Sequence, residues 1–250
     1  MERFKNQVAV ISGGADGLGK GIAHRLATEG CAVILLDINE PLLNKTVAEF
    51  RHSGFFTEGY VVDVSDEAAV FWAMEQVDKI FGKIDIMVNC AGIVGPTSTK
   101  ITDYPVEAYD KIYQVNLRGS FLMTKYALKV MEKNNYGRIL LLASIAGKEG
   151  NPFMTGYSSM KAGVLGLVKG VGKEYATTNI TINGLAPAVI HTALNDNTTP
   201  EQMAYMVNKI PMGRLGTVEE VAAISAWIVS KESSFNTGFI FDISGGRATY

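Results

Sequence analysis

Short apolar runs rich in β-branched residues alternate with longer segments of helical periodicity along almost all of this 250-residue chain. The apolar residues within each short run are continuous, which is typical of parallel strands that are covered by helices on both faces. Strand and helix repeated in this order favour an α/β fold. We predict one doubly wound parallel sheet of about seven strands, at residues 7–12, 32–37, 57–63, 84–89, 138–143, 181–186 and 238–242.

We predict one domain over residues 1–250, because the chain has no Pro- or Ser-rich linker, charge block or low-complexity tract. Helical periodicity predicts helices at 19–28, 41–52 and 67–81, among others. Residues 187–216 break this rhythm and are rich in Asn, Thr, Met and Pro. Long irregular segments of compact domains are usually functional. We therefore predict a covering loop at about residues 188–216.

Composition excludes several classes of protein. A net charge of −2 gives no electrostatic footprint for nucleic acid or an anionic membrane. No stretch approaches the roughly 20 apolar residues of a membrane span, and the first residues lack the apolar core of a signal peptide, so we expect a cytoplasmic protein. Cys31 and Cys90 lie in apolar runs and are expected to be packed free thiols. The three histidines have no metal-ligand spacing, and we expect no metal.

A glycine-rich turn, Ser-Gly-Gly-Ala-Asp-Gly-Leu-Gly at 12–19, follows the first predicted strand and precedes the first predicted helix. Small residues let the backbone approach a pyrophosphate, and the helix N-terminus offers free N–H groups with a partial positive charge. A plain turn with a helix cap is the alternative. The segment also matches part of a triphosphate-binding loop, but Gly21 stands where Ser or Thr would contact Mg²⁺. We therefore favour a dinucleotide cofactor over ATP or GTP.

Asp37 ends the second predicted strand. A carboxylate at this point accepts hydrogen bonds from the ribose hydroxyls of adenosine and repels a 2′-phosphate. Asp16, inside the glycine-rich turn, adds a second negative charge. A strand-terminal helix cap is the alternative role of Asp37. The two carboxylates predict NAD in preference to NADP.

Further motifs follow in order. They are Asn-Cys-Ala-Gly at 89–92, Asn116, Ser144, and Tyr157 followed four residues later by Lys161. Together with the glycine-rich turn, this ordered set resembles the short-chain dehydrogenase/reductase family over essentially the whole chain. The resemblance implies a Rossmann-like fold and hydride transfer between nicotinamide and a secondary alcohol or ketone.

The resemblance also implies the residues of the site. Its catalytic group would be Asn116, Ser144, Tyr157 and Lys161. Its cofactor-binding residues would be Gly13, Asp16, Gly17, Leu18, Gly19, Asp37, Asp63, Val64, Asn89, Ala91, Gly92, Tyr157, Lys161, Pro187, Val189, Ile190 and Thr192. Three positions depart from the usual family pattern: Ser12 replaces Thr, Cys90 replaces Asn, and Ala188 replaces Gly. Of these, Ala188 is the one expected to change the shape of a loop.

The chemistry suits these residue types. Tyrosine is a weak base with an ordinary pKa of about 10. Lys161 shares a helix face with Tyr157, and its charge, together with that of oxidised nicotinamide, is expected to lower the pKa of Tyr157. Ser144 would hydrogen-bond the substrate oxygen, and the resemblance gives Asn116 a supporting link beside Lys161. The alternative is a packed aromatic residue with a solvated lysine beside it.

The segments 186–190 and 241–250 are similar to those of bacterial NAD-dependent dehydrogenases that act on 2-keto-3-deoxy sugar acids, of the L-rhamnonate or L-fuconate type. A sugar acid or polyol is therefore the expected substrate. A 3-oxoacyl-carrier-protein reductase is one alternative, and a non-catalytic NAD-binding sensor or scaffold is another. A substrate carboxylate would need a cation, for which Lys148, His191 and Arg247 are candidates. The family resemblance also suggests a homotetramer packed through helices at 108–133 and 162–177.

Overall fold

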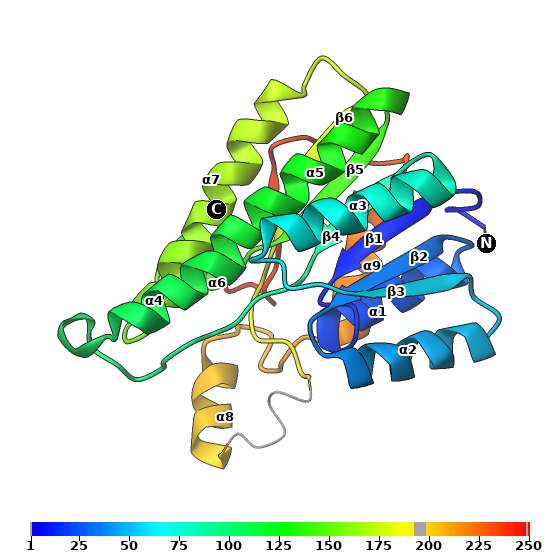
Figure 1. Cartoon of the computed structure of the whole chain (residues 1–250). Helices are drawn as coiled ribbons and strands as arrows, with labels where there is room; N and C mark the ends of the chain where they lie inside the picture. The colour runs from blue at the N-terminus through cyan, green and yellow to red at the C-terminus, as the bar shows by residue number, and fades with distance from the viewer. Residues whose placement is uncertain (1, 193–198, 249) are drawn as a thin grey trace.

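The computed structural model describes residues 2–192, 199–248 and 250. Within them it contains one seven-stranded parallel sheet in the order β3-β2-β1-β4-β5-β6-β7 (Figure 1). The strands are β1 (Val8–Ser12), β2 (Ala32–Asp37), β3 (Thr57–Val61), β4 (Ile86–Asn89), β5 (Gly137–Leu142), β6 (Ile180–Pro187) and β7 (Ile240–Ile243). The predicted fold class is confirmed, and each strand overlaps a continuous apolar run.

The helices that flank the sheet form two layers with separate cores. The flanking helices are α1 (Gly17–Thr28), α2 (Glu40–His52), α3 (Glu67–Phe81), α5 (Gly119–Asn134), α7 (Thr155–Glu174) and α9 (Val218–Ile228). Side chains of α1, α2 and α9 form the core on one face of the sheet, and those of α3, α5 and α7 form the core on the other. The central strands β1, β2, β4 and β5 are buried between these layers, which explains the apolar runs in their sequences.

The long helix predicted at 108–133 is interrupted. It consists of α4 (Val106–Ile112), a π-helical segment η2 (Tyr113–Arg118) and α5, which follow one another directly. Segments of π-helix are rare and are often found at functional sites. The interruption includes Asn116, one of the predicted catalytic residues.

The predicted irregular segment at 188–216 contains a helix, so that part of the prediction is wrong. Helix α8 (Pro200–Asn208) begins after Thr199, whose side chain accepts a hydrogen bond from Gln202 N, and it has Pro at its first position. Both are ordinary signals of a helix start. Residues 193–198 of the predicted loop lie outside the described residues. Figure 1 shows α8 standing apart from the two helix layers.

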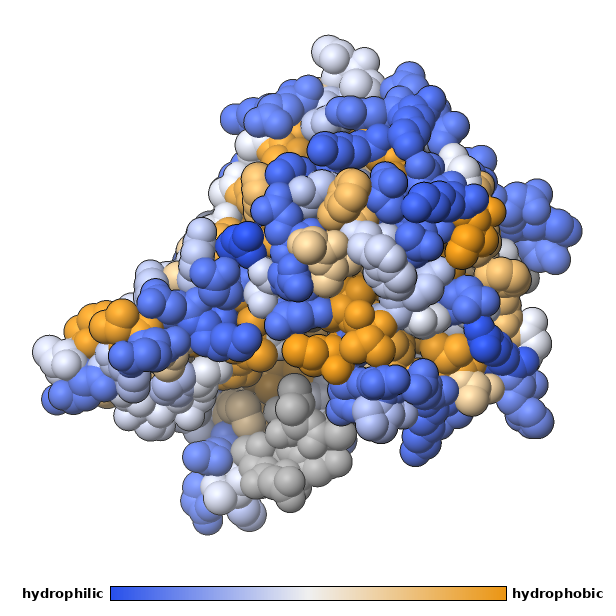
Figure 2. Space-filling model, in the orientation of Figure 1, coloured by the Kyte–Doolittle hydropathy of each residue, from blue (hydrophilic) through white to orange (hydrophobic). Residues whose placement is uncertain are grey.

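The strand order reverses between β1 and β4, and in such sheets ligands bind beyond the carboxyl ends of the strands at this point. In the space-filling view the molecule is hollowed between its main body and α8, and hydrophobic side chains border the hollow (Figure 2). Two short helices, η1 (Ile101–Asp103) and α6 (Ile145–Glu149), complete the described elements. No helix in the described parts of the chain is long and apolar enough to cross a membrane.

Candidate active site

The glycine-rich turn joins β1 to α1 and is closely packed on one side and open on the other. Gly13 and Gly17 have φ angles of 63° and 53°, which favour glycine. A Cβ atom on Gly19 would lie 2.0 Å from the carbonyl oxygen of Gly13, whereas one on Gly17 would meet no heavy atom within 4 Å. Asp16 precedes α1 and makes no side-chain capping hydrogen bond. The open helix N-terminus fits a pyrophosphate group.

The Asp37 carboxylate lies at the end of β2, beside this turn. Its Oδ2 accepts a hydrogen bond from Ala15 N (3.1 Å), and its Oδ1 accepts one from Asn39 N (3.0 Å). The side chain that caps α2 is that of Asn39, which accepts from Leu42 N. Asp37 is therefore not the helix cap of the alternative interpretation. It is an anchored negative charge where a ribose would be bound.

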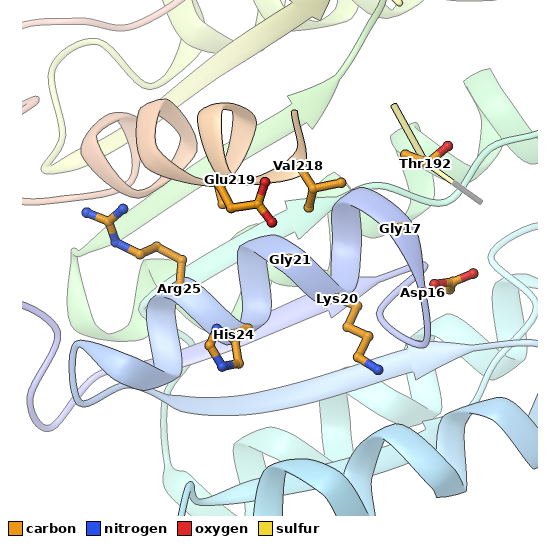
Figure 3. A pocket seen from close by; sticks show the side chains of 10 residues that line it. Asp16, Gly17, Lys20, Gly21, His24, Arg25, Thr192, Val218 and Glu219 are labelled. Carbon is orange, nitrogen blue, oxygen red and sulfur yellow. The ribbon is translucent and has the colours of Figure 1, made fainter. Parts of the chain in front are cut away.

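An open pocket of about 500 Å³ extends from the glycine-rich turn along α1 and the start of α9 (Figure 3). Its lining residues are Asp16, Gly17, Lys20, Gly21, His24, Arg25, Thr192, Val218, Glu219 and Ala222. Asp16, Gly17 and Thr192 lie at one end of this pocket, so the fold brings Thr192 near the turn. Lys20 instead points towards α2, where its Nζ pairs with Glu49 at 2.6 Å. It does not act as the lysine of a triphosphate-binding loop.

Asn89, at the end of β4, holds the turn in place through its side chain. Its Oδ1 accepts from Ser12 Oγ (2.6 Å), and its Nδ2 donates to Ser120 Oγ (2.9 Å). Ser12 Oγ in turn accepts from Ala91 N (3.2 Å). The hydroxyl at position 12, where Ser replaces the usual Thr, therefore acts both as a donor and as an acceptor. Gly92 follows Ala91 and lies beside Asn116 and Lys161.

Asp63 and Val64 follow β3. Burial raises the pKa of Asp63, but hydrogen bonds from the hydroxyl and backbone N–H of Ser65 outweigh burial and hold this pKa below its usual range. Val64 is buried and lies against Gly119, where a Cβ atom would be 2.9 Å from Val64 Cγ2. Both residues follow the carboxyl end of β3, among the positions where the resemblance implies that the cofactor binds.

Ser144, Tyr157 and Lys161 come together beyond β5. Ser144 caps α6, and its Oγ accepts from Ala146 N (3.1 Å). Tyr157 and Lys161 lie one turn apart on α7, with Lys161 Nζ 5.7 Å from the centre of the Tyr157 ring. Lys161 Nζ donates to the carbonyl oxygen of Leu142, the last residue of β5, at 2.6 Å. The lysine thus joins the helix that carries Tyr157 to the strand end that precedes Ser144.

Burial dominates the electrostatics of this group. Burial raises the pKa of the Tyr157 phenol, and a hydrogen bond with Ser144 counters only part of that effect. Burial lowers the pKa of the Lys161 ammonium to about 8. In the protein chain alone burial therefore dominates the pKa of Tyr157. The lowering of this pKa by Lys161 together with oxidised nicotinamide stays a prediction.

Asn116 is buried in the π-helical segment, and its side chain both donates to and accepts from the backbone of one residue. Its Nδ2 donates to Ile93 O and its Oδ1 accepts from Ile93 N, each at 2.8 Å. A Cβ atom on Gly92 would lie 3.4 Å from Asn116 Oδ1 and 3.7 Å from Lys161 Nζ. Asn116 therefore lies beside Lys161 and makes the predicted link to the backbone.

Pro187 ends β6, and the segment after it runs along neighbouring elements. Ala188 N donates to Ile243 O (3.0 Å), and Gly216 N donates to Val189 O (3.1 Å). Ile190 forms an isolated bridge with Gly216. Ala188 is not among the described residues with positive φ. Its backbone conformation is therefore open to alanine, and the departure from the family's Gly introduces no backbone strain.

These observations can now be compared with known proteins. A sequence model described as enoyl-(acyl carrier protein) reductase matches residues 13–248. A 2-dehydro-3-deoxy-L-rhamnonate dehydrogenase (NAD(+)) of Sphingomonas sp. (strain SKA58) is 43% identical over 99% of this chain and 98% of its own length. The chain belongs to the short-chain dehydrogenase/reductase family.

Other members of the family are similar over the same span. A 3-oxoacyl-[acyl-carrier-protein] reductase of Thermotoga maritima is 35% identical over 98% of both chains. The crystal structure of an NAD⁺-bound xylitol dehydrogenase is 32% identical, with a TM-score of 0.93 over 98% of this chain and 100% of that one. Both the fold and the family expected from the sequence are confirmed.

Two of the three candidate cations for a substrate carboxylate are already paired. Lys148 Nζ contacts Asp242 Oδ2 (2.7 Å), and Arg247 Nη2 contacts Glu149 Oε2 (2.7 Å), with only 8% and 9% of the two basic side chains exposed. His191 is exposed. No sequence pattern could reveal these pairs, since their members lie 94 and 98 residues apart.

Two other features of the site were not predictable from the sequence, whereas the packed free thiol of Cys90 was expected. Ile93 and Leu142 act through backbone atoms, which side-chain motifs do not report. Phe153, between α6 and α7, has a φ angle of 64°, an unusual conformation for an aromatic residue. Cys90 is a free thiol whose pKa burial raises to about 12, and it packs where the family usually has Asn. The described residues contain no cluster that could hold a metal ion.

Proposed function

We propose that this protein is an NAD-dependent oxidoreductase that transfers a hydride between nicotinamide and a secondary alcohol or ketone, with Tyr157 as the proton-transferring residue. The observation that carries this proposal is the grouping of Ser144, Tyr157 and Lys161 beyond β5, at the same sheet edge as the glycine-rich turn and Asp37. A protein that only binds NAD needs no such proton-transferring group.

When bound, NAD supplies the carbon that accepts the hydride and, in its oxidised form, a positive charge. In alcohol oxidation Tyr157, as phenolate, takes the hydroxyl proton of the substrate at its phenolic oxygen while the substrate carbon loses the hydride. The reverse reaction returns that proton. The Ser144 hydroxyl hydrogen-bonds the substrate oxygen and stabilises its developing charge.

Lys161 supports the phenolate. At 5.7 Å from the Tyr157 ring, its ammonium attracts the phenolate by about 3 kcal/mol at an effective dielectric constant of about 20. That is roughly a hundredfold in the acid dissociation constant of the phenol. Since burial raises the pKa of Tyr157, the ammonium alone does not bring it to neutral pH. We therefore assign the remaining stabilisation to the charge of the oxidised cofactor.

Asp37 supports the choice of NAD over NADP. Its carboxylate is fixed by two backbone N–H groups beside the turn, and Asp16 adds a second charge at the start of α1. A 2′-phosphate at this point would be repelled by both groups. The Sphingomonas relative carries NAD(+) in its name, and the similar xylitol dehydrogenase was crystallised with NAD⁺.

We propose a sugar acid or a polyol as the substrate. The 43% identity with the 2-dehydro-3-deoxy-L-rhamnonate dehydrogenase extends over nearly the full length of both chains, and the similar solved structure acts on xylitol. A 3-oxoacyl-carrier-protein reductase is the second candidate, favoured by several relatives of that name at 31–35% identity.

A spectrophotometric screen at the absorbance of NADH tests the proposal. NAD and NADP are each offered with sugar acids, with polyols such as xylitol, and, in the reductive direction, with a 3-oxoacyl thioester. NAD-linked oxidation of a sugar acid or polyol is the expected result. NADPH-linked reduction of the thioester as the fastest reaction would contradict both the proposed cofactor and the proposed substrate.

A homotetramer is also part of the proposal. Large apolar side chains on α4 and α5 remain exposed in the single chain, among them Val106 (68%) and Phe121 (48%). Exposed apolar groups of this kind mark interaction surfaces. Light scattering on the purified protein is expected to give four times the 27.0 kDa chain mass. We further propose a cytoplasmic location, supported by two cysteines that are free thiols, which cell fractionation tests.

A further inference from the structure

Residues 244–248 and 250, here called the C-terminal tail, follow β7 and contact α6. Gly245 and Gly246 have φ angles of 60° and 88°, which make the turn. Gly245 O accepts a hydrogen bond from Met212 N (3.0 Å), which joins the tail to the chain just after α8. The tail thus lies between the base of α8 and the elements that carry the catalytic group.

Arg247 connects the tail to the end of α6. Its Nη2 and Nε donate to Glu149 Oε2 at 2.7 and 3.0 Å, and its Nη2 also lies 3.3 Å from Asn151 Oδ1. The Arg247 side chain is 9% exposed and that of Glu149 is 30% exposed. A fork-shaped guanidinium held on a carboxylate and an amide fixes both position and orientation.

The loop reached by Arg247, residues 150–154, joins the two helices of the catalytic group. Ser144 precedes α6 and Tyr157 lies in the first turn of α7, so this joining loop sets their separation. Phe153 holds a φ angle of 64° within it. A non-glycine residue in this region is strained and persists only where its surroundings hold it.

Contacts besides Arg247 also hold the joining loop. Asn151 N donates to Ser158 Oγ (3.0 Å), Thr99 N donates to Phe153 O (3.2 Å), and Met154 N donates to Asn151 O (3.2 Å). The first two reach the loop backbone from α7 and from the segment before η1. Arg247 is the contact that reaches it from the C-terminal tail.

A second anchor lies one residue earlier on α6. Lys148 Nζ pairs with Asp242 of β7, and the Tyr250 hydroxyl donates to Lys148 O at 2.8 Å. Lys148 Nζ also lies 5.0 Å from the centre of the Tyr250 ring. The tail therefore holds α6 at two successive residues, with Tyr250 at Lys148 and Arg247 at Glu149.

We propose that Arg247 is a positioning residue, which holds the strained joining loop so that Ser144 and Tyr157 meet the substrate in the correct relative position. Arg247 acts through Glu149 and Asn151 and does not bind a substrate carboxylate itself, since its contacts with Glu149 engage two of its nitrogens. The expected change in KM rests on the proposed function, whereas the expected change in the order of the joining loop does not.

Kinetics and hydrogen exchange test the inference together. In Arg247→Ala we expect the KM for the alcohol substrate to rise about tenfold or more, equivalent to 1.4 kcal/mol or more, with NADH affinity within twofold of wild type. Amide exchange is expected to quicken in residues 145–154 and to stay unchanged in β1 and α1. Arg247→Lys keeps the charge and is expected to restore part of the loss. Pairing Arg247→Glu with Glu149→Arg is expected to restore more than either change alone.

Arg3→Ala is the matched control, because Arg3 forms a similar partly buried, two-contact pair with Glu29 at 2.7 and 3.1 Å. It is expected to change neither the substrate KM nor exchange in the joining loop. Unchanged exchange in residues 145–154 of Arg247→Ala would overturn the inference. A KM increase confined to carboxylate substrates, absent with xylitol, would instead make Arg247 a substrate-binding residue and would also overturn it. If wild type oxidises no alcohol, the proposed function fails, while the exchange result still decides the role of Arg247.

Discussion

Gly19→Ala is expected to disable cofactor binding without unfolding the protein. The added Cβ atom would lie 2.0 Å from Gly13 O and 2.7 Å from Gly13 C. Because C···O contacts in proteins lie at about 3.3 Å, the turn must open by about 1.3 Å. Backbone atoms on both sides of the contact leave no flexible side chain to give way. Overpacking of this kind costs typically about 1–3 kcal/mol of stability, which a domain of this size tolerates.

The functional consequence of the substitution comes from weaker cofactor binding. Hydrogen bonds to a charged group contribute about 1.5–3 kcal/mol each, and a displacement of about 1.3 Å removes any bond that the turn makes to a pyrophosphate. One such loss weakens NADH binding roughly tenfold to a hundredfold. Fluorescence titration with NADH measures this, with thermal unfolding as a check. The control is Gly166→Ala on α7, where an added Cβ meets no atom within 4 Å. NADH affinity of Gly19→Ala within threefold of the control would refute the reasoning.

Three further outcomes are expected. In Asp37→Asn the ratio of kcat/KM for NAD to that for NADP falls by roughly tenfold or more, since one charge facing the 2′-phosphate is removed; an unchanged ratio would remove Asp37 from the account. NADH affinity falls as the pH rises above about 8, because Lys161, whose pKa is about 8, is charged below that pH and neutral above it. Lys161→Met should abolish this pH dependence. If the pH dependence persists in Lys161→Met, another group causes it. Ser144→Ala lowers kcat about a hundredfold and lowers the stability by about 1 kcal/mol through loss of the α6 cap. The matched control Thr217→Ala removes the cap of α9; it lowers the stability by a similar amount and leaves kcat unchanged. Equal effects of the two cap substitutions on kcat would show that Ser144 acts only as a cap.

The sheet could be predicted because its physical cause is local. A strand buried on both faces requires a continuous apolar run, and the central strands β1, β2, β4 and β5 each contain one. The boundaries of α3 at Glu67–Phe81 were likewise predictable from periodicity and from Asp66, which caps the helix. Thr199 and Pro200 are signals for the start of α8, but the irregular composition of the surrounding residues led to the prediction of a loop.

The remaining features depend on contacts between distant residues. The π-helical segment at Tyr113–Arg118 accompanies the pairing of Asn116 with the backbone of Ile93, and no local pattern encodes such a partner. The pairs formed by Lys148 and Arg247 lie far apart in the sequence. The pKa values of Tyr157 and Lys161 are set by burial, which requires the packed structure. The residue types of the candidate catalytic group could therefore be read from the sequence, whereas the pKa shifts that burial causes could not.

The most direct test of the central claim is the turnover of Tyr157→Phe with NAD and an alcohol substrate that wild type oxidises, measured together with NADH affinity. The substitution removes one buried hydroxyl and leaves the ring, Lys161 and the glycine-rich turn in place. The account predicts loss of nearly all turnover with NADH affinity close to wild type. Turnover near the wild-type rate in this variant would contradict the role of Tyr157 as the proton-transferring residue.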